Sequence, residues 1–183
     1  MHSINADINI HTIKSGEGKL VFTTTKDQEN QFTVQKKDNI LYIRSTNKNS
    51  NDKSSINLSQ PNSISTLKVV SVSGDISIDD TILKNVYIET VSGNIDLNNT
   101  AAIQAKLKSV SGDILWQGAT ITTEITTISG NVVFNSYLPI AGEIHAQSFS
   151  GDVLVPKDIP KGRNLINIKS VSGDIHITNV TNN

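Results

Sequence analysis

Apolar and polar positions alternate along the chain from about residue 67 to residue 178, in units that repeat around six glycines. In every unit, apolar residues stand five places before the glycine and two and four places after it. Alternation with a period of two is typical of half-buried strands. Each unit therefore predicts two short strands joined by a corner at the glycine. The six glycines are Gly74, Gly93, Gly112, Gly130, Gly151 and Gly173.

The units share residue types as well as polarity, because each glycine follows Ser and precedes Asp or Asn, as in SVSGDISI (71–78). The glycines are 18 to 22 residues apart. In a parallel solenoid, units stack about 4.8 Å apart and each position meets the same environment in every unit. The recurrence therefore predicts an all-β parallel solenoid of about six rungs (β-helix or β-roll-like). Ser-Gly and Gly-Asp also form hairpin turns, so an antiparallel meander is the alternative.

The column two places before the glycine is apolar as well, although the strand's alternation would make it an outward position. Beside an obligatory glycine, such a break in parity predicts a bulge or sharp bend that turns the chain inward again. This column consists of Val72, Val91, Val110, Ile128, Phe149 and Val171.

The chain divides into three parts of one structural domain. Residues 1–48 predict a β cap for the apolar end of the solenoid, since an uncovered end exposes its core and strand edges. Residues 49–66 predict a polar loop with a degenerate rung at INLSQP (56–61), and residues 67–183 are the solenoid repeats. The strands expected within the cap are 6–12, 19–25, 31–35 and 40–45.

The composition excludes several classes of protein. Ser, Thr and Asn fill 58 positions and aromatic residues make up 4%, which argues against a helical bundle. A net charge of −1 lacks the basic footprint of a nucleic-acid binder, and no apolar run is long enough to insert into a membrane. The chain has no cysteine, so disulfides and thiolate chemistry are excluded.

These motifs, with a strand–Pro connection at LVPKDIPKG (154–162), resemble the bacterial "putative adhesin" domain family over about residues 6–178. The function of that family is largely unknown. The resemblance implies a right-handed parallel β-solenoid of a cell-envelope or surface protein, and it supplies no catalytic residues. The start, MHSINADINIHT, lacks signal-peptide features. We therefore expect an extracellular or envelope location if a signal or anchor was trimmed, and a cytoplasmic one if the chain is full length.

The residue after each glycine is acidic or an amide, which suggests two roles. A row of oxygen ligands can bind calcium, but calcium-binding β-rolls supply several ligands in each turn. Asp and Asn at corners more often accept hydrogen bonds from backbone amides. We therefore predict a structural corner ladder and no metal or other cofactor. Its members are Asp75, Asn94, Asp113, Asn131, Asp152 and Asp174.

The column three places before the glycine is a row of hydroxyls, which can be mistaken for nucleophiles. The four histidines occupy no matching position, so no acid–base partner is evident and no catalytic residue is predicted. We expect an internal ladder of hydroxyls that bond along the stack. The hydroxyls are Ser71, Thr90, Ser109, Thr127, Ser148 and Ser170, and the histidines are His2, His11, His145 and His176.

Outward positions offer one apolar feature, an aliphatic stripe of Leu115, Val133 and Leu154 three places after their glycines. These residues are neighbours if the rungs stack in sequence order. Either the loop 136–142 or the N-terminal block covers the stripe, or it contacts a ligand or another subunit. Outward Glu89 and Lys108 are expected to be neighbours on adjacent rungs.

These observations favour a non-enzymatic adhesin-like module that binds or displays to protein or glycan at a bacterial cell surface. A second hypothesis is a self-assembling scaffold, because few residues follow Ile177 to cover the last rung. It would form homo-oligomers through that solenoid edge or the aliphatic stripe. A third, a polysaccharide-active β-helix enzyme, lacks the expected cluster of outward carboxylates with basic partners.

Overall fold

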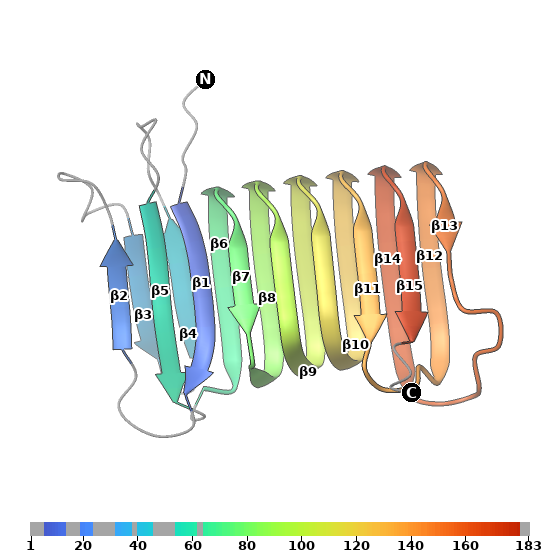
Figure 1. The fold of residues 1–183 in the computed structure, drawn as a ribbon, viewed down its shortest axis with the longest axis horizontal. Helices are drawn as coiled ribbons and strands as arrows, with labels where there is room; N and C mark the ends of the chain where they lie inside the picture. Colours follow the sequence, from blue (N-terminus) through green and yellow to red (C-terminus); the bar gives the residue numbers. More distant parts are fainter. Residues whose placement is uncertain are drawn as a thin grey trace.

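The computed structural model describes residues 6–13, 19–23, 32–37, 40–45, 54–61 and 64–179. These residues form fifteen strands and no helix. The strands lie side by side along the long axis of the molecule, in two layers (Figure 1). All pairs between repeat units are parallel, so the predicted all-β parallel solenoid of about six turns is confirmed, and the antiparallel meander is wrong.

Each rung contains one strand in each layer, joined at the corner glycine. β9 (Ile95–Ser111) and β10 (Ile114–Ser129) serve two rungs each, because they begin in the second layer and continue into the first. The other strands of the first layer are β6 (Thr66–Ser73), β8 (Ile82–Ser92), β12 (Gly142–Ser150) and β14 (Asn164–Ser172). Those of the second layer are β7 (Ile76–Asp79), β11 (Val132–Ser136), β13 (Val153–Leu154) and β15 (Ile175–Asn179).

The rungs do not stack in sequence order. β14 pairs with both β10 and β12, and β15 pairs with both β11 and β13. The sixth rung therefore lies between the fourth and the fifth (Figure 1). The expectation of an open edge after Ile177 is wrong for the same reason, because β15 has a neighbour on each side and the fifth rung is the terminal one.

Burial gives a physical reason for this order. The sixth rung points four isoleucines inward, and each is at most 1% exposed. At the matching positions the fifth rung has smaller residues in three of the four places, so its loss of cover at the end of the solenoid costs less hydrophobic free energy. The four isoleucines are Ile166, Ile168, Ile175 and Ile177, and their counterparts are Ile144, Ala146, Val153 and Val155.

The core is a set of columns, each built from one inward position of every rung. Ile76, Ile95 and Ile114 form part of one such column and are at most 1% exposed. Trp116 and Phe134 are fully buried in another, with ring centroids 6.0 Å apart. Both residues stand four places after their glycines, a position at which the alternation predicts an inward side chain.

The N-terminal strands continue both layers beyond the first rung. β4 (Ile40–Ser45) pairs in parallel with β6, and β3 (Phe32–Lys37) follows it in antiparallel orientation. In the second layer, β1 (Ala6–Ile13) pairs with β7, β5 (Ser54–Pro61) pairs with β1, and the antiparallel β2 (Lys19–Thr23) comes last. All four strands expected in this block are present. INLSQP lies in β5, so it is a strand parallel to the rungs, although β1 separates it from them.

The corners hold neighbouring rungs close together. Gly112 has a φ of +140°, and a Cβ on it would lie 2.1 Å from the carbonyl oxygen of Gly93. Its own amide donates to the carbonyl of Ser129 on the next rung. A side chain is therefore disfavoured twice, by the backbone conformation and by the approach of the adjacent rung.

The corner ladder lies beside these glycines, and hydrogen bonds between adjacent rungs link its members. The side-chain oxygen of Asp75 accepts from the Asn94 amide at 2.7 Å, and that of Asn94 accepts from the Asp113 amide at 2.9 Å. The bonds then pass to Asn131, Asp174 and finally Asp152, at 2.7 to 2.9 Å. The ladder therefore runs between rungs, and its order shows independently that the sixth corner precedes the fifth.

We expect Gly112→Ala to lower the free energy of unfolding by about 2 kcal/mol or more, because the alanine is strained and collides with the Gly93 carbonyl. Urea denaturation measures the change. Ser111→Ala, at an exposed position beside the corner, is the control and should change stability by less than about 0.5 kcal/mol. Equal effects of the two substitutions would contradict the close approach.

We expect Asn94→Ala to lower the free energy of unfolding by about 1 kcal/mol, because the Asp113 amide loses its partner. Asp152→Ala is the matched control, since no described amide donates to that last carboxylate of the ladder. Its effect in the same denaturation experiment should be close to zero. A larger loss for Asp152→Ala than for Asn94→Ala would show that the ladder bonds contribute nothing.

Candidate functional site

An exposed apolar ridge follows the glycine corner along all six rungs. Its fractional exposures run from 40% at Val72 to 89% at Phe149. The expectation that this column turns inward is wrong, because the strand keeps its alternation up to the corner: Ser71 points inward at 2% exposure and Val72 points outward. We call this column the corner ridge. In spatial order it consists of Val72, Val91, Val110, Ile128, Val171 and Phe149.

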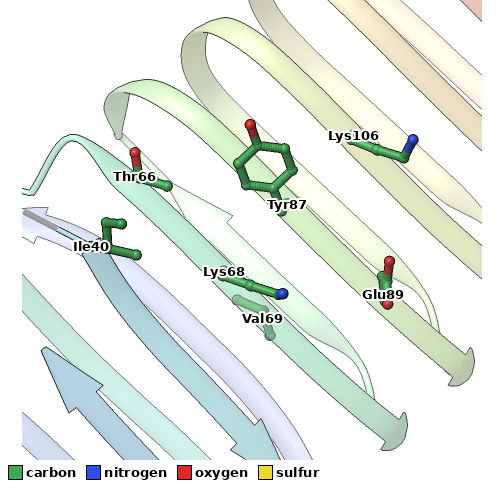
Figure 2. Close-up of a pocket in the computed structure, with 7 residues that line it drawn as sticks. All are labelled: Ile40, Thr66, Lys68, Val69, Tyr87, Glu89 and Lys106. Atoms are coloured by element: carbon green, nitrogen blue, oxygen red, sulfur yellow. The ribbon is translucent and has the colours of Figure 1, made fainter. Parts of the chain in front are cut away.

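A shallow groove of about 260 Å³ lies on the outer face of the first layer, where β4, β6 and β8 run side by side (Figure 2). The Tyr87 ring lies between Lys68 on one side and Lys106 on the other, in register across three strands. A flat aromatic face beside cations and hydroxyls suits polar ligands with an apolar face. The groove is lined by Ile40, Thr66, Lys68, Val69, Tyr87, Glu89 and Lys106.

Charges on this face are largely neutralised by neighbours on adjacent rungs. Lys106 Nζ lies 2.8 Å from Glu124 Oε2, and Lys108 Nζ lies 4.0 Å from Glu89 Oε1. The predicted proximity of Glu89 and Lys108 is thus confirmed. Within the described part of the chain, Lys68 has no carboxylate at ion-pair distance. It is therefore the cation of the groove that is available to a ligand.

Sequence reasoning missed Tyr87 and Thr66, although Tyr87 occupies the same outward position as Lys68 and Lys106, six places before its glycine. The Tyr87 hydroxyl donates to Gln104 Oε1 at 3.4 Å. Thr66 Oγ1 accepts from Asn85 Nδ2 at 3.0 Å. The contribution of Ile40 has no local signal, because β4 reaches the groove only through the pairing of distant segments.

The aliphatic stripe is brought together only in part. Leu115 and Val133 are register neighbours on β10 and β11 and are half-buried. Val133 is followed by His176, and Leu154 lies beyond that histidine. The inserted sixth rung therefore interrupts the stripe that sequence order would have made continuous. Leu154 belongs instead to the exposed terminal rung.

The hydroxyl column lies inside the solenoid, which removes it from any external substrate. Ser148 Oγ donates to the Gly173 carbonyl at 2.8 Å, a bond between adjacent rungs. Thr90 Oγ1 instead bonds within its own rung, and Ser109 Oγ and Thr127 Oγ1 have no hydrogen-bond partner in the described structure. The expected bonding along the stack is therefore present for only part of the column.

Among the described residues, no group of three or more His, Asp or Glu side chains is arranged to hold a metal ion. The Asp and Asn oxygens of the corner ladder, from Asp75 to Asp174, each accept from a backbone amide. These hydrogen bonds join adjacent rungs at the corner.

The pKa of the Asp96 carboxyl lies above its ordinary value of 3.8. Burial raises that pKa, Asp79 nearby raises it further, and a hydrogen bond with Asn98 partly opposes the rise. Asp96 lies on the outer face of the second layer, beside Leu115 in register. One of its oxygens, Oδ1, is buried without a partner. A buried carboxylate oxygen without a hydrogen-bond partner lowers the stability of the folded chain.

We expect Asp96→Asn to stabilise the protein more at neutral pH than in acid. A carboxyl with a raised folded-state pKa keeps its proton longer in the folded chain, so stability falls as pH rises from its ordinary value of 3.8 through the folded pKa. The amide removes this loss. Urea unfolding of both proteins at about pH 3 and about pH 7 measures the difference. Asp158→Asn, in an exposed loop, is the control, and a gain that shrinks towards pH 7 would contradict the argument.

No helix among the described residues is long and apolar enough to cross a membrane.

The fold is similar to the crystal structure of a putative cell adhesion protein from Clostridium sporogenes, with a TM-score of 0.59 and 14% sequence identity. That alignment covers 97% of this chain and 90% of the other. No curated protein matches the sequence. The family model described as Toastrack DUF4097 matches residues 2–183. The chain therefore belongs to the Toastrack DUF4097 family, and its fold is a β-solenoid.

Proposed function

We propose that this domain is a non-enzymatic module of a bacterial cell-envelope or surface protein, and that it binds or displays to protein or glycan through its outer surface. The observation that carries the proposal is the corner ridge. Exposed apolar rows of this length are uncommon on isolated soluble proteins and mark contact surfaces. The six rungs space its side chains about 4.8 Å apart, which gives a straight contact line of roughly 24 Å.

The groove around Tyr87 supports the same proposal by offering a second kind of contact. A sugar ring can stack on the tyrosine face while Lys68 and Glu89 form hydrogen bonds at its rim. The similarity to a putative cell adhesion protein, at 14% identity, supports the solenoid fold on which this surface is built. The compartment follows from the family resemblance and is part of the proposal.

The enzyme hypothesis is less well supported by the same geometry. Glycan hydrolysis needs two carboxyl groups that face one substrate with different protonation states. On the described outer face of the first layer, Glu89, Glu124 and Glu143 each lie beside a cationic or histidine side chain. These are exposed ion pairs of small energy, and none is paired with a second carboxyl.

The test is a binding titration of fluorescently labelled protein on intact bacterial cells, purified cell-wall sacculi and immobilised envelope proteins. We expect saturable binding that the triple variant V91S/V110S/I128S weakens at least tenfold, because the ridge loses its apolar contact. The variant I103S/I121S/L165S is the matched control, since it removes three exposed aliphatic side chains from the opposite corner.

Two outcomes would overturn the proposal. One is the absence of saturable binding to all three targets up to about 100 µM. The other is turnover of acidic or neutral glycans by the purified domain in a screen of oligosaccharides. Equal losses for the two triple variants would move the contact away from the corner ridge.

A further inference from the structure

The terminal fifth rung breaks the burial pattern that every other rung keeps. In the first layer, Ile144 and Ala146 are partly exposed, whereas their register partners Ile166 and Ile168 are 1% and 0% exposed. In the second layer, Val153 is 40% exposed against 1% for its partner Ile175. The apolar cross-section of the solenoid therefore ends without full cover.

Large apolar side chains also concentrate on the outside of this rung. Phe149 is 89% exposed, the highest value of any large apolar residue described, and Leu154 is 59% exposed. The same corner-ridge position on the five other rungs is 40% to 51% exposed, because each has a neighbour on both sides. Phe149 has a neighbouring rung on one side only, so it lacks the contact that the fold provides elsewhere.

The backbone of this rung is open as well. β12 pairs with β14, and no described strand pairs along its other edge. At its corner, the Asp152 amide donates to Asp174, but no described amide donates to the Asp152 carboxylate. A strand edge with free donors and acceptors is a template for another strand.

The chain covers only the start of this edge with its own residues. The loop 155–163 runs past the end of the solenoid (Figure 1). Pro160 O accepts from the Gly142 amide at 2.9 Å, and Ile159 packs against the core. From Ile144 to the corner, no described strand pairs along this edge, and Phe149 on the outer face beside it is 89% exposed.

We propose that this edge pairs with the same edge of a second copy, antiparallel and about a twofold axis near Gln147, to form a closed dimer. In this register Gln147 faces its own symmetry mate, and Ala146 faces Ser148 of the second copy. His145 faces the second copy's Phe149 and covers it. No like charges then lie opposite one another across the strands.

A second copy fits better than a head-to-tail stack for a structural reason. In the described residues, the opposite end of the solenoid terminates in the antiparallel strands β2 and β3 and shows no seventh corner for the ladder to continue onto. Pairing of like edges uses only features that the terminal rung itself supplies, and it stops at two copies. This inference is independent of the binding role proposed above.

Sedimentation velocity of the full chain across concentration tests the proposal. We expect a reversible monomer–dimer equilibrium with a dissociation constant below about 100 µM. Gln147→Lys should weaken the dimer at least tenfold, because two like charges then face each other at the axis. Gln104→Lys is the matched control, an exposed glutamine on an interior rung, and should leave the equilibrium unchanged.

The absence of cysteine allows a direct test of the register. We expect the Gln147→Cys variant to form an intermolecular disulfide under mild oxidation, since directly opposed residues of antiparallel strands are about 4.5–5.5 Å apart at Cα. The Gln104→Cys variant should cross-link only at the background rate. A strictly monomeric wild type, growth beyond the dimer, or equal cross-linking of the two variants would each overturn the proposal.

Discussion

The spacing of the rungs at the glycine corner is the constraint on which the rest of the structure depends. At five of the six corners, a Cβ on the glycine would lie 2.1 to 2.3 Å from the carbonyl oxygen of the glycine on a neighbouring rung, so no other residue fits without moving a backbone. Because the backbones are that close, the Asp or Asn after one glycine can accept from the amide on the next rung. The corner therefore fixes both the distance between rungs and their register, and every inward column follows from that register.

Once the corners are equivalent, burial decides which rung stands where. Any of the six corners can lie beside any other and form the same hydrogen bond, because the motif Ser-Gly-Asp/Asn is common to all of them. The sixth rung, with four inward isoleucines, takes the interior place, and the fifth, with Ala146 and two valines, takes the end. As a consequence, the chain leaves the place beside the fourth rung empty, forms the fifth rung at the end, and then returns to insert the sixth rung between the two. Asn164 stabilises that crossing, because it accepts from the Ala141 amide and donates to the Thr120 carbonyl.

Features set by the residues of a single rung could be predicted from sequence, and features set by the choice of neighbour could not. The strands, the corner ladder and the buried pair of Trp116 and Phe134 follow from alternation around each glycine. The rung order does not, because identical corners carry no information about which rung comes next. The only trace of the rung order is the wider glycine spacing of 21 and 22 residues at the end of the repeat.

The direction of the corner ridge was predicted wrongly, because a glycine corner suggests a bulge, whereas the strand alternates without interruption up to Val72. The groove at Tyr87 depends on β4, whose pairing with β6 no local pattern encodes.

The two proposals meet at Phe149, which ends the corner ridge and is covered in the proposed dimer, and their geometry connects them. The corner ridge lies at the end of the first-layer strands, where they meet the glycines. A twofold axis perpendicular to the layers would reverse the strand direction of the second copy, so the two ridges would lie along opposite edges of the dimer. A monomer offers one apolar line of contact, whereas such a dimer offers two. Because the axis is perpendicular to the layers, the outer faces of both first layers point the same way, so both ridges can contact one flat target and bind it twice. The orientation of the terminal rung thus bears directly on whether the domain binds a surface through one ridge or through two.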